Sequence, residues 1–195
     1  MATTPARSRD RERVENDLIE AAAELLGEFG PRALTVRMVA ERAGVNHGLI
    51  HHYFGGKQPL LAAAMRRLVS EHQQLVAERT GDSPIPAPLA LGDDPRYLRA
   101  VLRCVLDGEM GLARTEVDAG VSVPRRALDH IAARRGQQPP DLATKTEVGI
   151  EMALEMGWVA LEPFIFAVLD VAPHEQEELR ERVRARRRQR AGAHS

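Results

Sequence analysis

Apolar residues recur along this sequence with the period of an α-helix, and the alternating pattern of a β-strand is absent. In the first apolar segment they fall mostly three or four residues apart, at Leu18, Ala22, Leu25, Leu26 and Phe29. Intervals of that kind put side chains on one face of a helix. The Gly30-Pro31 pair that follows is a helix-ending signal. We therefore predict a first helix that ends at Gly30 and buries this face.

Two short helices and the start of a longer one are predicted next. Thr35 is a favourable N-cap residue for the second helix. The apolar residues of that helix are Val36, Val39, Ala40 and Ala43. Gly44 would end it, and residues 45–54 would form the third helix. The Gly55-Gly56 pair would end the third helix, and a long fourth helix would begin near Lys57.

The rest of the chain also favours helices, separated by proline and glycine. Residues 81–95 are rich in both and are predicted to form a loop. Asp94-Pro95 is typical of a cap and the first position of another helix. A helix over about residues 124–135 follows, then a long apolar helix from Asp141 to about residue 170, and a charged helix after Pro173. The expected fold class is all-α, with a small N-terminal unit of three helices and a larger helical unit after it.

The segment from Thr35 to Leu61 carries the most informative pattern, because it reads as a helix, a four-residue turn and a second helix. Gly44 in the turn can adopt a positive φ at no steric cost. Val45 and Ile50 would fill the junction between the two helices. These are the features of a helix-turn-helix, whose second helix enters the major groove of DNA.

The residue types in and around the second of these helices suit contact with DNA. Short polar or planar side chains that can reach base edges are Asn46, His47 and His51. Gly48 removes a side chain and would let the helix approach the bases or backbone closely. Groups suited to phosphates, which fix register without reading sequence, are Thr35, Arg37, His52, Tyr53 and Lys57.

This segment resembles the signature of the TetR family of bacterial transcription regulators. The matching positions are Thr35, Ala40, Ala43, Gly44, Val45, Gly48, Tyr53, Phe54 and Lys57, with Leu26, Phe29 and Gly30 matching the end of the family's first helix. Two positions depart from the family pattern. Asn46 replaces a small hydroxyl residue, and His51 stands where tyrosine is more common. Both lie on the expected reading surface, so they affect the operator sequence rather than DNA binding itself.

The resemblance implies a function for the whole chain. It implies a helix-turn-helix DNA-binding domain over residues 1–58 and a ligand-binding and dimerisation domain over residues 59–195. Family members are homodimers that bind double-stranded operator DNA, and most are repressors released by a small-molecule effector. We therefore expect a homodimeric, ligand-responsive repressor in the bacterial cytoplasm, with a transcriptional activator or a ligand-independent DNA binder as the alternative.

A ligand pocket is the least specific of these expectations. Methionine adapts to irregular apolar shapes, and the large apolar residues that could line a pocket for a partly apolar ligand are Met110, Met152, Met156, Trp158 and Phe164. Ordinary core packing is the alternative for each of them.

Composition and missing motifs exclude several other functions. The formal net charge is −1 and there is one cysteine, Cys104, so no intramolecular disulfide is expected. No signal peptide and no membrane-spanning stretch is recognised.

His47 and His51 have the i, i+4 spacing of metal ligands, but a third ligand is not evident. No catalytic or cofactor-binding motif is recognised, so neither an enzyme, a cofactor nor a metal is expected. An enzyme or carrier built on the apolar C-terminal helices remains the alternative from another class.

Overall fold

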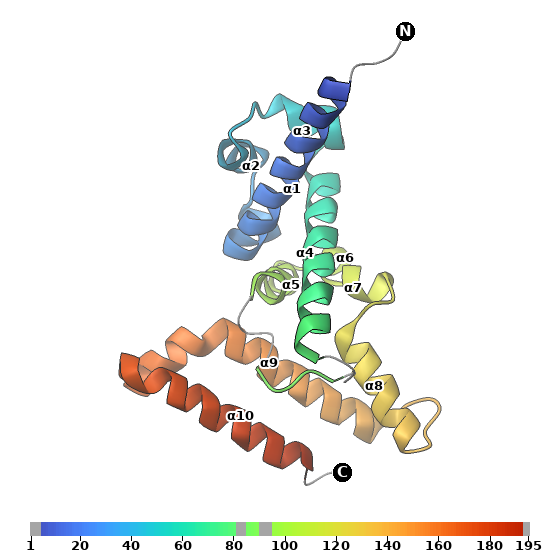
Figure 1. Ribbon diagram of the computed structural model, residues 1–195, viewed down its shortest axis with the longest axis vertical. Helices are drawn as coiled ribbons and strands as arrows, with labels where there is room; N and C mark the ends of the chain where they lie inside the picture. The colour runs from blue at the N-terminus through green and yellow to red at the C-terminus, as the bar shows by residue number, and fades with distance from the viewer. Residues whose placement is uncertain (1–4, 81–84, 90–94, 193–195) are drawn as a thin grey trace. The chain divides into compact units, whose positions relative to one another are not determined.

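The computed structural model describes residues 5–80, 85–89 and 95–192. Over these residues it contains helices and no strand, which confirms the predicted all-α fold class. The α-helices, in chain order (Figure 1), are α1 (Pro5–Ala33), α2 (Val36–Ala43), α3 (Gly48–Phe54), α4 (Lys57–Thr80), α5 (Arg96–Leu106), α6 (Met110–Ala113), α7 (Thr115–Asp118), α8 (Val123–Arg134), α9 (Leu142–Val168) and α10 (Gln176–Gly192). A single turn of 3₁₀-helix, Pro173–Glu175, precedes α10. None of the described helices is long and apolar enough to cross a membrane.

The residues form two compact units, each built from two stretches of the chain. Unit 1 combines residues up to His72 with Arg96–Gly120, and unit 2 combines the stretch from Gln73 to Pro95 with residues from Val121 onward. The functional division after residue 58 stays a prediction. Asp94, the expected cap of α5, lies outside the described residues.

Capping residues set the ends of the N-terminal helices largely as predicted. The Thr35 hydroxyl oxygen accepts a hydrogen bond from the Met38 N–H and caps α2, and Gly44 ends α2 with φ 67°. The prediction that the third helix starts at Val45 is wrong, because α3 begins at Gly48. The Val45 N–H donates to the Ala40 carbonyl oxygen over 2.9 Å, so Val45 belongs to the Schellman-type end of α2.

Unit 1 buries the apolar face predicted for the first helix, with one exception. Its largest fully buried side chains include Leu18, Leu26, Leu34, Ile50, Leu60, Leu61 and Met65. Phe29 is 45% exposed. It comes directly before Gly30, where non-helical dihedrals interrupt α1 and turn the chain. The prediction that Phe29 shares the buried face is therefore wrong.

Two glycines of α1 allow α5 to pack closely against it in unit 1. A Cβ atom on Gly27 would lie 3.5 Å from the Arg96 carbonyl oxygen, and one on Gly30 would lie 2.8 Å from Asp107 Oδ2. The same Asp107 oxygen accepts a hydrogen bond from the Arg32 N–H over 2.9 Å, which caps the turn after Gly30. The two ends of α5 are thus fixed to successive turns of α1.

Unit 2 is organised around α9, which begins where Asp141 caps it by accepting a hydrogen bond from the Thr144 N–H. Helix α10 lies beside α9 in the opposite direction (Figure 1). Arg187 of α10 donates to Glu155 over 2.6 Å and to Glu151 over 2.7 Å. The charged last helix is therefore held to the apolar one mainly by arginine–carboxylate pairs.

The pairing of Glu162 with Arg180 makes the stability of unit 2 depend on pH. Hydrogen bonds from Arg180 lower the pKa of Glu162, helped by the Trp158 indole N–H, while burial acts in the opposite direction. A carboxylate whose folded pKa is lowered stabilises the fold above its ordinary pKa of about 4.3 and loses that contribution as the pH falls. We expect Glu162→Gln to lower the Tm at pH 7 by about 2–4 °C.

Thermal unfolding of both proteins from pH 7 down to pH 3 measures this effect. The Tm difference should shrink as the pH falls through about 4. Glu178→Gln is the control, because the Arg182–Glu178 pair is exposed on both sides. A difference for Glu162→Gln that stays constant over the whole range would contradict the assigned cause.

Candidate nucleic-acid interface

Helices α2 and α3 form a helix-turn-helix with a buried junction. Val39 of α2 and Ile50 of α3 are both completely buried. The turn between the helices contains Gly44 in the left-handed region, and Gly55 with φ 76° ends α3. One side of the seven-residue α3 is thus anchored in the core of unit 1, and the other side remains at the surface.

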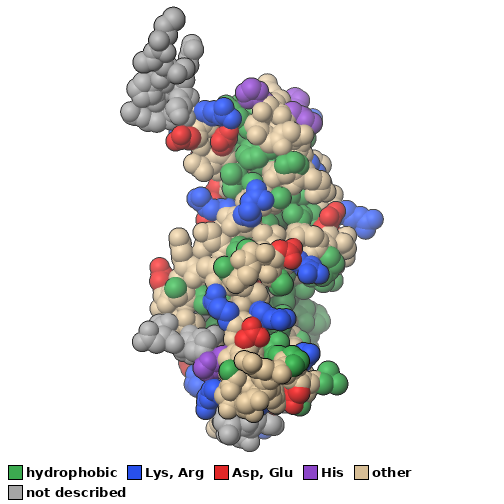
Figure 2. All heavy atoms as spheres, turned by 90° about the vertical axis from the view of Figure 1, so that its right-hand side faces the viewer, with side chains coloured by type: hydrophobic (Ala, Val, Ile, Leu, Met, Phe, Trp, Pro, Cys, Tyr) green, Lys and Arg blue, Asp and Glu red, His purple; other side chains and the backbone are tan. Residues whose placement is uncertain are grey.

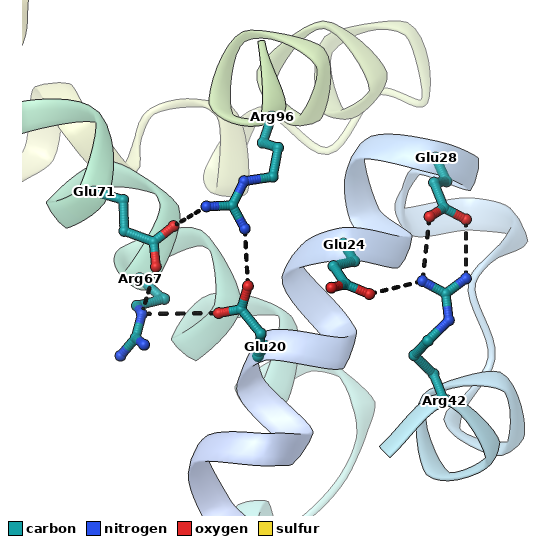
Figure 3. Close-up of polar contacts among 7 residues, drawn as sticks. All are labelled: Glu20, Glu24, Glu28, Arg42, Arg67, Glu71 and Arg96. Carbon is teal, nitrogen blue, oxygen red and sulfur yellow. Dashed lines mark hydrogen bonds and ion pairs between the residues drawn. The ribbon is translucent and has the colours of Figure 1, made fainter. Parts of the chain in front are cut away.

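Helix α2 is held to α1 by an arginine that the sequence analysis did not single out. Arg42, near the end of α2, donates to Glu24 over 2.7 Å and to Glu28 over 3.1 Å (Figure 3). These hydrogen bonds raise the pKa of Arg42, so it stays charged at any physiological pH. The signal in the sequence is weak, because the partners are 14 and 18 residues away.

A second cluster of charges joins α1, α4 and α5 (Figure 3). Arg96 of α5 donates to Glu20 of α1 over 2.8 Å and to Glu71 of α4 over 2.9 Å. Arg67 of α4 approaches the same two carboxylates, at 3.9 Å and 2.7 Å. Together with Glu24 and Glu28, Glu20 forms an acidic row at i, i+4 and i+8 along α1. Arginines from α2, α4 and α5 therefore converge on one face of α1 and brace the helix-turn-helix.

The residues predicted to contact bases lie on the exposed side of α3 and just before it. His47 and His51 are exposed, and histidine side chains gather near the top of the face drawn in Figure 2. Asn46 is exposed too, but its Oδ1 accepts a hydrogen bond from the Gly48 N–H over 2.8 Å. A Cβ atom on Gly48 would lie 3.2 Å from the same oxygen. Asn46 and Gly48 therefore shape the start of α3, a role in addition to the predicted DNA contacts.

The Asn46 side chain is expected to stabilise the start of α3. We predict that Asn46→Ala lowers the free energy of unfolding by about 1 kcal/mol, the usual cost of removing a helix-capping side chain. Asn46→Asp keeps the accepting oxygen and should cost much less. Urea unfolding of the three proteins gives the comparison. Equal destabilisation by alanine and aspartate would mean that the hydrogen bond to Gly48 contributes nothing.

The residues predicted to contact phosphates flank α3. Thr35 is exposed, and because its oxygen accepts from Met38, the hydroxyl hydrogen can still point outward. Arg37 is 85% exposed and pairs with Glu41 over 2.8 Å. That pair raises the pKa of Arg37, and a phosphate would have to replace Glu41. Tyr53 and Lys57 are half-buried, and the rings of His52 and Tyr53 meet edge to face at 4.9 Å.

Residues 18–64, which span this helix-turn-helix and the start of α4, match the profile described as bacterial regulatory proteins, tetR family. This helix-turn-helix part of the chain belongs to the tetR family. A protein of Mycobacterium tuberculosis named HTH-type transcriptional repressor Rv3405c is 28% identical over 92% of this chain and 93% of its own length. HTH-type transcriptional regulator BetI of Stenotrophomonas maltophilia is 38% identical over 47% of this chain and 41% of its own length.

Solved structures resemble the fold of this chain. A tetR-family transcriptional regulator from Streptomyces coelicolor matches with a TM-score of 0.53 and 19% identity, covering 76% of this chain and 71% of that protein. A mutant of HlyIIR matches with a TM-score of 0.57 and 12% identity, covering 83% and 92%. The chain is a helix-turn-helix transcriptional regulator, and neither its family nor its relatives indicate an enzyme.

The structure places the five predicted pocket residues of this tetR-family regulator in different units. Met110 is in α6 of unit 1 and is exposed, whereas Met152, Met156, Trp158 and Phe164 are on α9 of unit 2. Trp158 is half-buried and its indole N–H donates to Glu162 over 2.8 Å. The ligand pocket formed by these residues stays a prediction.

A cleft of about 420 Å³ lies where α9 and α10 meet in unit 2. The residues described around it are Glu162, Pro163, Phe166, Ala167, Asp170, Val171, Gln176 and Arg180, and none of the predicted pocket residues is among them. Two of its polar members are paired with each other, since Arg180 donates to Glu162 over 2.8 Å, and Arg180 also lies over the Phe166 ring at 5.2 Å. Among the residues that the structure describes, no group of three histidine, cysteine, aspartate or glutamate side chains could hold a metal ion.

Proposed function

We propose that this tetR-family protein is a homodimeric repressor that binds operator DNA through α3 of each subunit and is released by a small, partly apolar ligand. The observation that carries the DNA-binding part is the position of α3. Its apolar residue Ile50 is fixed in the core while His47 and His51 remain exposed beside it. Imidazole groups in such a position can donate to and accept from base edges in the major groove.

An exposed apolar row on α9 supports the homodimer. Its members alternate at spacings of four and three residues and are Ile150, Leu154, Gly157, Leu161, Phe164 and Val168. The five with side chains are 40–66% exposed. We call this row the α9 seam. A 3.5-residue repeat is the pattern by which one helix packs against another, and in a homodimer the same surface of each subunit can meet.

Gly157 at the middle of the α9 seam suits a close helix crossing. A Cβ atom added there would meet nothing within 4 Å. Because Gly157 has no side chain, the backbone of a second α9 could approach closely at this point, with Leu161 and Phe164 packing on one side of the crossing. A second copy of the chain offers an equally apolar seam, so it matches this surface better than a polar partner would.

Repression as the mode of action is supported by the relative in M. tuberculosis, which is named a repressor and aligns over 92% of this chain. A dimer with two copies of α3 would read two half-sites about 34–36 Å apart on one face of the duplex. A repressor bound there would block transcription until a ligand favours a conformation that does not fit both half-sites. Such a regulator would act where the DNA is, in the bacterial cytoplasm.

The first test is selection of binding sites from random duplex DNA without added ligand, followed by footprinting. We expect a protected inverted repeat whose affinity falls steeply as the salt concentration rises. Arg37→Ala and Tyr53→Ala should abolish this binding, whereas Arg125→Ala, an exposed arginine of unit 2, should leave it unchanged. A folded protein that selects no sequence would contradict the proposal.

Ligand release is tested with the selected operator. Small amphipathic compounds are screened for a rise in Tm, and those that raise it are added to the protein–operator complex. The proposal expects at least one of them to weaken operator binding. Tight binding of compounds with no loss of operator affinity would argue for a ligand-independent DNA binder, and increased transcription from the bound promoter would argue for an activator.

A further inference from the structure

The start of α1 lies against the C-terminal part of α3. The Arg11 guanidinium of α1 sits over the ring of Tyr53, with 5.5 Å between Cζ and the ring centroid. Arg11 Nε donates to Glu15 over 3.1 Å, and the Arg11 side chain is 63% exposed. Its two terminal nitrogens have no partner among the side chains that the structure describes. An exposed, positively charged group with unused donors therefore stands beside a residue already expected to contact phosphate.

The helical register of α1 explains why an arginine stands at this position. Arg11, Leu18 and Leu25 are seven residues apart and lie on one face of the helix. Leu18 and Leu25 are buried in unit 1. On this face of α1, leucines therefore occupy the positions inside the core. Arg11 occupies the next position outside the core, where α1 lies beside Tyr53. Arg13, two residues later, points away from this face and is exposed.

We propose that Arg11 is an additional DNA contact, which binds the phosphate backbone next to the half-site read by α3. A guanidinium can stack on an aromatic ring and at the same time donate two hydrogen bonds to a phosphate. Tyr53 thereby orients Arg11, and the two residues contact the same stretch of the DNA phosphate backbone. The contact adds affinity without reading sequence. This inference rests on the proposed operator binding, and it extends the DNA-binding surface from α2 and α3 to α1.

The test compares Arg11→Ala with Arg13→Ala in the full-length protein on the selected operator. Both variants remove one positive charge from the same helix. We expect Arg11→Ala to weaken binding about tenfold and to reduce the slope of log K against log salt by about 0.9 per subunit. Arg13→Ala should change neither, and Arg11→Lys should restore part of the affinity. The Tm of each variant is measured to show that it is folded.

A purely structural role for Arg11, acting by orienting Tyr53, predicts a different result. In that case Arg11→Ala would weaken operator binding, but the slope of log K against log salt would not change. Equal losses for Arg11→Ala and Arg13→Ala would also overturn the inference, because only net charge would then matter. Both results leave operator binding by the wild-type protein intact, so they differ from the failure of the proposed function, in which the wild type itself selects no DNA.

Discussion

Replacing Phe164 and Val168 with glutamate is expected to leave the protein monomeric and to weaken operator binding at least 100-fold. These side chains are 66% and 63% exposed in the single chain and stand at the end of the α9 seam. Full burial of such side chains contributes about 1.5–3 kcal/mol each, and in a two-fold symmetric dimer each substitution counts twice. The variant would also bring four carboxylates together at the seam. A monomer holds a single α3 and can bind only one half-site.

Light scattering coupled to size-exclusion chromatography and operator titration measure both effects. The matched control is Met152→Glu with Leu169→Glu, which adds the same charge at exposed apolar positions outside the seam, one on α9 and one directly after it. It should remain dimeric and bind DNA like the wild type. If the seam variant stays dimeric at micromolar concentration, then a different surface joins the subunits and the proposed dimer is wrong.

Local chemistry explains why much of unit 1 could be predicted from the sequence. The ends of α2 depend on Thr35 and Gly44, and each makes its capping interaction within a few residues of its own position. The turn after Gly44 was misjudged because Val45 is apolar and looks like the first residue of a helix. Its N–H instead bonds back to Ala40. Helices α6 and α7 were missed because a four-residue helix is too short to show a period.

Contacts between distant residues could not be predicted in the same way. Arg96 meets Glu20 across 76 residues and Glu71 across 25, and nothing in a single sequence distinguishes these charges from solvated ones. The positions predicted to contact DNA could be predicted from the sequence only in part. The exposure of His47 and His51 follows from the helical period. The hydrogen bond from the Gly48 N–H to Asn46 Oδ1 depends on the conformation of a local turn, which the residue types alone do not determine.

Helix α9 shows how packing adds to an apolar pattern. The sequence of α9 is apolar on nearly every side, which left open which residues are core and which are interface. The structure buries Val159 and Phe166 and exposes Leu161 and Phe164. Only this separation reveals the α9 seam, because the sequence alone does not show which apolar residues of α9 stay exposed.

Replacing Gly30 with alanine is expected to lower the free energy of unfolding by about 3 kcal/mol, the sum of two costs. The first is backbone strain. Gly30 has φ 78° and ψ 167°, a region that is essentially restricted to glycine. The second is steric, because the new Cβ would lie 2.8 Å from Asp107 Oδ2 and 3.2 Å from the Arg103 Cβ. Moving Asp107 away would also weaken its bond to the Arg32 N–H.

Gly44→Ala is the comparison for the Gly30 substitution, because it strains the backbone without a steric clash. Gly44 has φ 67° and ψ 29°, the ordinary left-handed region, and a Cβ there meets nothing within 4 Å. Strain alone should then cost about 1 kcal/mol. Thermal unfolding should show a fall in Tm of about 6–12 °C for Gly30→Ala and about 2–4 °C for Gly44→Ala. Equal falls in Tm for the two variants would mean that Asp107 and α5 move away from the methyl group added at Gly30 at little cost. A larger shift at Gly30 is the expected result, because its restricted backbone region and its close contacts with Asp107 and Arg103 both act against alanine.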